Sequence, residues 1–168
     1  PAVRTMAPAV KWMLAPVTIV FCIIAVAVFV GFYLGLPQYW ISYLTFSPFS
    51  VAGNQLAFAD MGAQYWRLVT PIFLHFGWLH IVFNTLWLWE LGSKVERAIG
   101  SINTLFLIVV IALVSNTSQY LVTGPSLLGG LSGVVYGLLG FAWVAPLLQP
   151  RWKIQPTSTV MLFMVGWL

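Results

Sequence analysis

The amino-acid sequence predicts an all-α membrane protein in which residues 1–168 form a single transmembrane domain, incomplete at its C-terminus. The expected bundle has four complete transmembrane helices, a truncated fifth and a membrane-embedded first loop. Hydrophobic residues make up 61% of the chain and charged residues only 6%, whereas soluble domains carry about 25% charged residues. The long apolar runs are continuous rather than alternating, so helices are the structure that satisfies the backbone in lipid.

The first predicted helix covers residues 16–36, after a short basic segment at residues 1–15. This apolar run is longer than the hydrophobic part of a typical signal peptide and lacks a clear cleavage site behind it. The single cysteine, Cys22, lies inside the run. We interpret it as a small core residue, and the run as a transmembrane helix.

An aromatic segment, residues 37–77, follows the first helix. Its apolar character is interrupted by helix breakers at Pro37, Pro48, Gly53, Gly62 and Pro71. A high density of Trp and Tyr is typical of the membrane–water interface. We therefore predict short helices partly embedded at one face of the membrane.

Three further helices are predicted at residues 78–91, 102–122 and 132–148, with a Gly-rich, uncharged loop at residues 123–131. A last apolar run starts near residue 156 and ends with the chain. It is about 13 residues long, whereas a membrane span needs roughly 20. We therefore expect the sequence to be a fragment that stops inside a fifth helix.

Basic residues indicate the orientation of these helices. Six of the seven lie at the chain start and after the second and fourth helices, at Arg4, Lys11, Lys94, Arg97, Arg151 and Lys153. These places share one side if each run crosses once, and the positive-inside rule makes that side cytoplasmic. The N-terminus is then cytoplasmic, and the second and fourth helices start at the outer face. The same bias accounts for the net charge of +4 without a nucleic-acid partner.

Polar residues cluster at the starts of the second and fourth helices. His75, His80 and Asn84 lie at the first, and Ser132 and Tyr136 lie at the second. Polar groups at membrane depth are costly and by default suggest function. His80 and Asn84 are four residues apart and share one helix face. The topology therefore predicts that both groups lie at a similar depth near the outer membrane face.

Structural roles could also explain these residues. Gly129, Gly133 and Gly137 form a small-xxx-small stripe, a common device for close helix packing, and a serine at a helix start is often just a cap. The two histidines could bond the backbone at the interface. Their spacing of five places them on different faces without an acidic partner, which disfavours a metal site. We predict neither a metal nor a cofactor.

The functional interpretation is acyl transfer by a serine nucleophile. Ser132 would attack, while His80 and Asn84 would donate hydrogen bonds to the developing oxyanion. Backbone N–H groups at a helix N-terminus also suit an anion. The general base is missing, because His80 could act as the base only by giving up the donor role.

These residues closely resemble the motifs of the rhomboid intramembrane serine protease family, in its bacterial GlpG type. The matching segments are Trp66-Arg67, His75 to His80 and Asn84, Glu96-x-x-x-Gly100, and Gly130-Leu-Ser132-Gly133 with Tyr136. The resemblance implies a rhomboid-like six-helix bundle in the bacterial inner membrane. It also implies cleavage of transmembrane protein substrates near the outer membrane face by a Ser–His dyad.

The resemblance implies that Ser132 is the nucleophile and that His80 and Asn84 line the oxyanion hole. It gives supporting roles to six further residues, His75, Tyr136, Gly130, Gly133, Trp66 and Arg67. The dyad histidine is expected on a sixth helix. A C-terminal segment missing from this sequence would have to supply it, either as a continuation of the chain or as a separate chain.

The absent base motivates the alternative of a non-catalytic rhomboid-like protein that binds transmembrane clients. A channel or transporter is disfavoured, because the sequence has no midplane ion site and no pair of broken helices.

Overall fold

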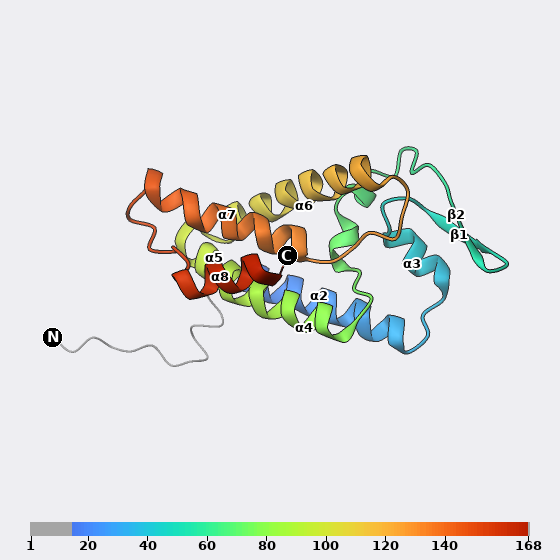
Figure 1. Ribbon diagram of the computed structural model, residues 1–168, viewed down its shortest axis with the longest axis horizontal. Coiled ribbons are helices and arrows are strands. Elements are labelled where there is room, and N and C mark those ends of the chain that lie inside the picture. The colour runs from blue at the N-terminus through green and yellow to red at the C-terminus, as the bar shows by residue number, and fades with distance from the viewer. Residues whose placement is uncertain (1–14, 168) are drawn as a thin grey trace.

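The computed structural model describes residues 15–167, which form a helical bundle with a small β-hairpin at one end (Figure 1). The predicted basic segment with Arg4 and Lys11 lies outside the described residues, as does Leu168. The elements are α2 (Pro16–Tyr33), α3 (Gln38–Leu44), β1 (Phe49–Ala52), β2 (Gln55–Phe58), η1 (Tyr65–Leu68), η2 (Thr70–Phe73), α4 (Trp78–Trp87), η3 (Leu88–Gly92), α5 (Ser93–Ile99), α6 (Ser101–Thr123), α7 (Ser132–Leu148) and α8 (Ser158–Trp167). The prediction of a mostly helical bundle is confirmed.

Helix α2 begins at Pro16, whose fixed φ suits the first helical turn. Its first free N–H groups are bound by a carboxylate from α5. Glu96 accepts hydrogen bonds from the N–H of Val17 at 2.9 Å, and from the N–H and hydroxyl of Thr18 at 2.9 and 2.8 Å. Glu96 is buried, and these bonds replace the hydration that burial removes. The negative charge also favours a helix N-terminus.

Two helices among residues 15–167, α2 and α6, are long and apolar enough to cross a membrane. The buried residues of α2 are three or four positions apart and face the bundle, at Thr18, Phe21, Ala25 and Phe29. On the opposite face Ile23 is 61% exposed, which suits contact with lipid. Helix α7 is shorter, at 17 residues. The count of four complete spans therefore stays a prediction.

The second helix runs further than predicted. It was expected to end at residue 91, but the chain continues through a π-helical turn, η3, into α5 and ends at Ile99. Gly100 ends it with φ +84°, a conformation that favours glycine. Lys94 and Arg97 thus lie in the last helical turns rather than in a loop. Lys94 forms an ion pair with Glu90 one turn earlier, which supports helix at this point.

The aromatic segment is only partly helical. The predicted short helices are present as α3, η1 and η2, but the prediction is wrong for β1 and β2. These strands pair antiparallel, with Phe49 opposite Phe58 and Ala52 opposite Gln55. Gly53 enters the turn with φ +63°. The Gly53-Asn54 dipeptide is a recognised hairpin signal, so the sequence did contain the information.

Within this segment, Trp66 and Arg67 connect η1 to α3. Nη1 of Arg67 donates to the carbonyls of Ser42 at 2.5 Å and Thr45 at 2.8 Å. The ring of Trp66 stacks on Tyr43 with centroids 5.0 Å apart, and its indole N–H donates to the Tyr43 carbonyl at 3.3 Å. Arg67 is buried, so its charge is held by carbonyl oxygens at the end of α3.

Helix α7 lies beside α6 in the bundle (Figure 1). The predicted fifth run begins as α8 and reaches both α4 and α7. Phe163 of α8 lies against Trp87 of α4, with ring centroids 5.8 Å apart. The hydroxyl of Tyr136 in α7 donates to the carbonyl of Met164 at 2.8 Å. The N-terminal part of α7 is therefore enclosed by α4, α6 and α8.

Candidate active site

A small cavity of about 40 Å³ lies among α4, α7 and α8. It is lined by His80, Phe83, Asn84, Trp87, Ser132, Val135, Tyr136 and Met164. Four residues singled out from the sequence, which lie on two separate helices, therefore share one cavity. Ser132 is the first residue of α7 and is half-buried. Within residues 15–167, no side-chain hydrogen bond caps α7, so the structure does not support the interpretation of this serine as a helix cap.

Gly130 allows the His80 ring to approach the serine loop, which we define as residues 129–131 directly before Ser132. Its φ of +115° is a conformation that side chains rarely adopt. A Cβ atom at this position would lie 2.6 Å from both Cε1 and Nε2 of His80. The N–H of Gly130 also donates to the carbonyl of Pro71 at 3.0 Å. The backbone conformation and the close approach of His80 therefore both require glycine at position 130.

His75 supports the same loop from the segment before α4. Its Nε2 accepts a hydrogen bond from the Leu131 N–H at 3.3 Å, and its Nδ1 lies 3.3 Å from the Phe73 carbonyl. Both bonds form together in the neutral tautomer with the proton on Nδ1. Burial, together with the neighbouring His80, lowers the pKa of His75 to about 4. The ring is therefore neutral near pH 7, as the acceptor role requires.

Asn84 and His80 belong to successive turns of α4. The Nδ2 atom of Asn84 donates to the backbone carbonyl of His80 at 2.8 Å. This bond uses one of the two amide protons and fixes the orientation of the side chain, which is buried. The second proton remains for a group in the cavity. Within the described residues, the Ser132 hydroxyl makes no hydrogen bond to either histidine.

The stripe of small residues serves two different contacts. A Cβ atom on Gly133 would lie 2.5 Å from the Ser115 hydroxyl of α6, and one on Gly137 would collide with Ile111 of the same helix. A Cβ atom on Gly129 would instead lie 2.8 Å from Leu74. Packing against α6 therefore explains the second and third glycines, whereas the first one seats the serine loop on the segment before α4.

Trp87 is a cavity residue that sequence reasoning missed. Its indole nitrogen is buried and has no hydrogen-bond partner among the described residues. The side chain lines the cavity one turn beyond Asn84. Its spacing of three residues from Asn84 puts both on one helix face, and this spacing is the sequence signal that could have identified it. Among residues 15–167, no group of three or more His, Cys, Asp or Glu side chains is arranged to hold a metal ion.

Comparison with known proteins finds a family that matches the part of the chain containing this cavity. A family model described as the Rhomboid domain matches residues 62–168, which include every residue of the cavity. The chain is 42% identical over 105 residues to a rhomboid protease GlpG homolog of Cronobacter sakazakii. It is 45% identical over 105 residues to the rhomboid protease GlpG of Serratia proteamaculans.

A third relative, the rhomboid protease GlpG of Yersinia pseudotuberculosis, is 43% identical over 105 residues. Each of these matches covers 62% of this chain. The matched part amounts to 38% of the length of the Cronobacter protein and 37% of the other two. The chain thus spans well under half the length of the curated relatives that it matches.

Proposed function

The chain belongs to the rhomboid family, and from this premise we propose that it carries the serine half of an intramembrane serine protease. The observation that supports this most directly is the cavity shared by Ser132, His80 and Asn84. It brings a hydroxyl nucleophile to the same place as two side chains that can donate hydrogen bonds. The three relatives are each named as a rhomboid protease, which agrees with this proposal.

In the proposed reaction the Ser132 oxygen attacks the carbonyl carbon of a substrate peptide bond. The hydroxyl proton passes to a histidine base, which then protonates the departing amine as the C–N bond breaks. Water hydrolyses the resulting acyl-enzyme by the same route and returns the serine. The base is the dyad histidine expected on a sixth helix outside residues 1–168, in the same chain or in a separate one.

The donors are His80, the free amide proton of Asn84 and the backbone N–H groups at the start of α7. They would stabilise the negative charge on the tetrahedral oxygen. Gly130 would keep the His80 ring against the loop, and His75 would keep the loop in place.

We further propose that the substrates are transmembrane proteins cleaved near the outer face of a bacterial inner membrane. The end of α5 and the segment after α7 carry Lys94, Arg97, Arg151 and Lys153. By the positive-inside rule this end is cytoplasmic, as is the N-terminus. Ser132 starts α7 at the opposite end, so the cleavage site would lie near the outer face.

The experiment is a chimera in which the chain is continued after Leu168 with the C-terminal region of the Serratia relative. The chimera should cleave a single-span substrate in vesicles and react with a fluorophosphonate probe. Ser132→Ala should abolish both, whereas Ser118→Ala, on the exposed face of α6, should change neither. Full cleavage by Ser132→Ala would refute the nucleophile assignment. Capture of the substrate without cleavage would favour the client-binding alternative.

A further inference from the structure

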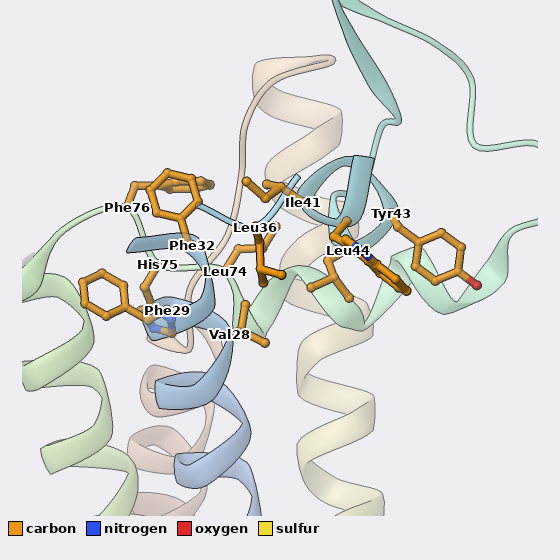
Figure 2. A pocket seen from close by; sticks show the side chains of 11 residues that line it. Val28, Phe29, Phe32, Leu36, Ile41, Tyr43, Leu44, Leu74, His75 and Phe76 are labelled. Atoms are coloured by element: carbon orange, nitrogen blue, oxygen red, sulfur yellow. The ribbon is translucent and has the colours of Figure 1, made fainter. Parts of the chain in front are cut away.

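A second cavity, larger and apolar, lies between α2, α3 and the segment before α4 (Figure 2). Its volume is about 310 Å³. Val28, Phe29 and Phe32 of α2 line one side, and Ile41 and Leu44 of α3 line another. Figure 2 shows the phenol oxygen of Tyr43 pointing away from the other side chains. The cavity is therefore lined by aliphatic and aromatic side chains.

The lining indicates the chemistry of the occupant. Among the residues that the structure describes, no charged side chain lines the cavity, and apolar cavities do not hold water. An engineered apolar cavity of about 150 Å³ binds benzene, and small-ligand pockets begin at about 300 Å³. A void of 310 Å³ leaves many side-chain atoms without dispersion partners. A flexible hydrocarbon of more than a few carbons would restore those contacts.

The surroundings indicate where such a hydrocarbon comes from. Phe32, Leu36 and Trp40 line the cavity and are also 40%, 44% and 49% exposed. Large apolar side chains at this exposure face lipid in a chain with membrane-crossing helices. Trp and Tyr residues such as Trp40 belong at the level of the headgroups, where acyl chains begin. We infer that this cavity binds one acyl chain of a bilayer phospholipid, entering between α2 and α3.

The site adjoins the serine loop through one residue. His75 lines this cavity, and the same ring accepts the hydrogen bond from Leu131, directly before Ser132. Figure 2 shows the His75 ring beside Phe29 at the edge of the group. A bound acyl chain would therefore pack against the histidine that orders the serine loop. Binding itself requires no protease activity, so the inference stands apart from the proposed function.

The experiment uses the chain reconstituted in vesicles of phosphatidylethanolamine and phosphatidylglycerol. A small fraction of the phosphatidylethanolamine carries a photoreactive diazirine near the end of one acyl chain. Labelled residues are then identified by mass spectrometry. We expect the label to concentrate on residues 28–44 and 74–76. A second probe with the diazirine on the headgroup should label these residues weakly.

Two filling substitutions from opposite walls test the cavity itself. Val28→Trp and Leu44→Trp should each lower the labelling about tenfold, because overlap with the acyl chain weakens binding. Val30→Trp is the matched control, since Val30 lies on the same helix, is 42% exposed and does not line the cavity. Val28→Ala enlarges the cavity and should retain the label. This variant keeps the inference testable if a filled variant does not fold.

Two results would overturn the inference. The first is acyl-probe labelling that spreads evenly over the exposed face of α6 and is unchanged by both filling substitutions, which means ordinary annular lipid. The second is equal labelling of residues 28–44 by the headgroup probe, which excludes a buried acyl chain.

Discussion

The Nε2 atom of His75 accepts a hydrogen bond from the backbone N–H of Leu131 at 3.3 Å. This contact joins the segment before α4 to the loop before α7, across 56 residues of sequence. Both groups are buried. The residue before the candidate nucleophile is thus fixed by a side chain that does not line the serine cavity.

The first prediction concerns His75. His75→Phe keeps a ring of similar size but leaves the buried Leu131 N–H without an acceptor. We expect a loss of about 1–3 kcal/mol in the free energy of unfolding, measured by denaturant or thermal unfolding in detergent. His75→Gln, which retains an acceptor, should lose less. Equal stability of the Phe and wild-type chains would contradict the role assigned to this bond.

Gly130→Ala should damage the site in two ways. The φ of +115° is unfavourable for alanine, and the new methyl group would collide with the His80 ring. We expect the chimera to lose its reaction with the fluorophosphonate probe. Gly140→Ala is the control, because a Cβ atom there meets no atom of the described residues within 4 Å. Similar probe labelling in the two variants would show that the His80–Gly130 approach is unimportant.

Asn84→Ala should lower turnover by the chimera by about 10²–10³-fold if the amide is a main oxyanion donor. Asn103→Ala provides a matched control. Asn103 makes the same kind of bond, from Nδ2 to the carbonyl of Ile99 four residues earlier at 2.7 Å, but lies outside the serine cavity. Steady-state cleavage rates separate the two. A wild-type rate in Asn84→Ala would remove this residue from the oxyanion hole.

Glu96→Gln should destabilise the bundle. The three donors are the N–H of Val17 and the N–H and hydroxyl of Thr18. The glutamine oxygen can accept from two of them at most, and the glutamine NH2 group would face the third. One backbone N–H would therefore be left unpaired. The expected loss is about 1–3 kcal/mol. Glu90→Gln removes a partly exposed ion pair with Lys94 and should cost about 0–1 kcal/mol. Thermal unfolding of both variants provides the comparison, and equal losses would count against the capping role.

Much of the helical bundle could be predicted because its signals are local. Helix α7 covers Ser132–Leu148 as predicted, since glycines precede it and an apolar run follows. The continuation of α4 into α5 was missed because Gly92 and Lys94 look like a turn after an apolar run. In the structure Gly92 is buried in a π-helical turn against Thr18, a contact that no local pattern indicates.

The polar part of the site could be predicted from the sequence. His80 and Asn84 share a helix face, and charge patterning predicts that Ser132 lies at their depth. The apolar wall of the cavity, with Trp87 and Met164, was not predicted. Hydrophobic residues in an apolar run carry no chemical signal of their own, and the position of α8 depends on long-range packing.

The carboxylate of Glu96 also has a consequence for how the protein is made. It binds the first N–H groups of α2 from 79 residues further along the chain. Because a ribosome synthesises the N-terminal end first, α2 leaves it long before Glu96 exists. The start of α2 must therefore rely on water or lipid headgroups during early membrane insertion. It acquires its final partner only when the second hydrophobic segment has been translated and has folded back beside it.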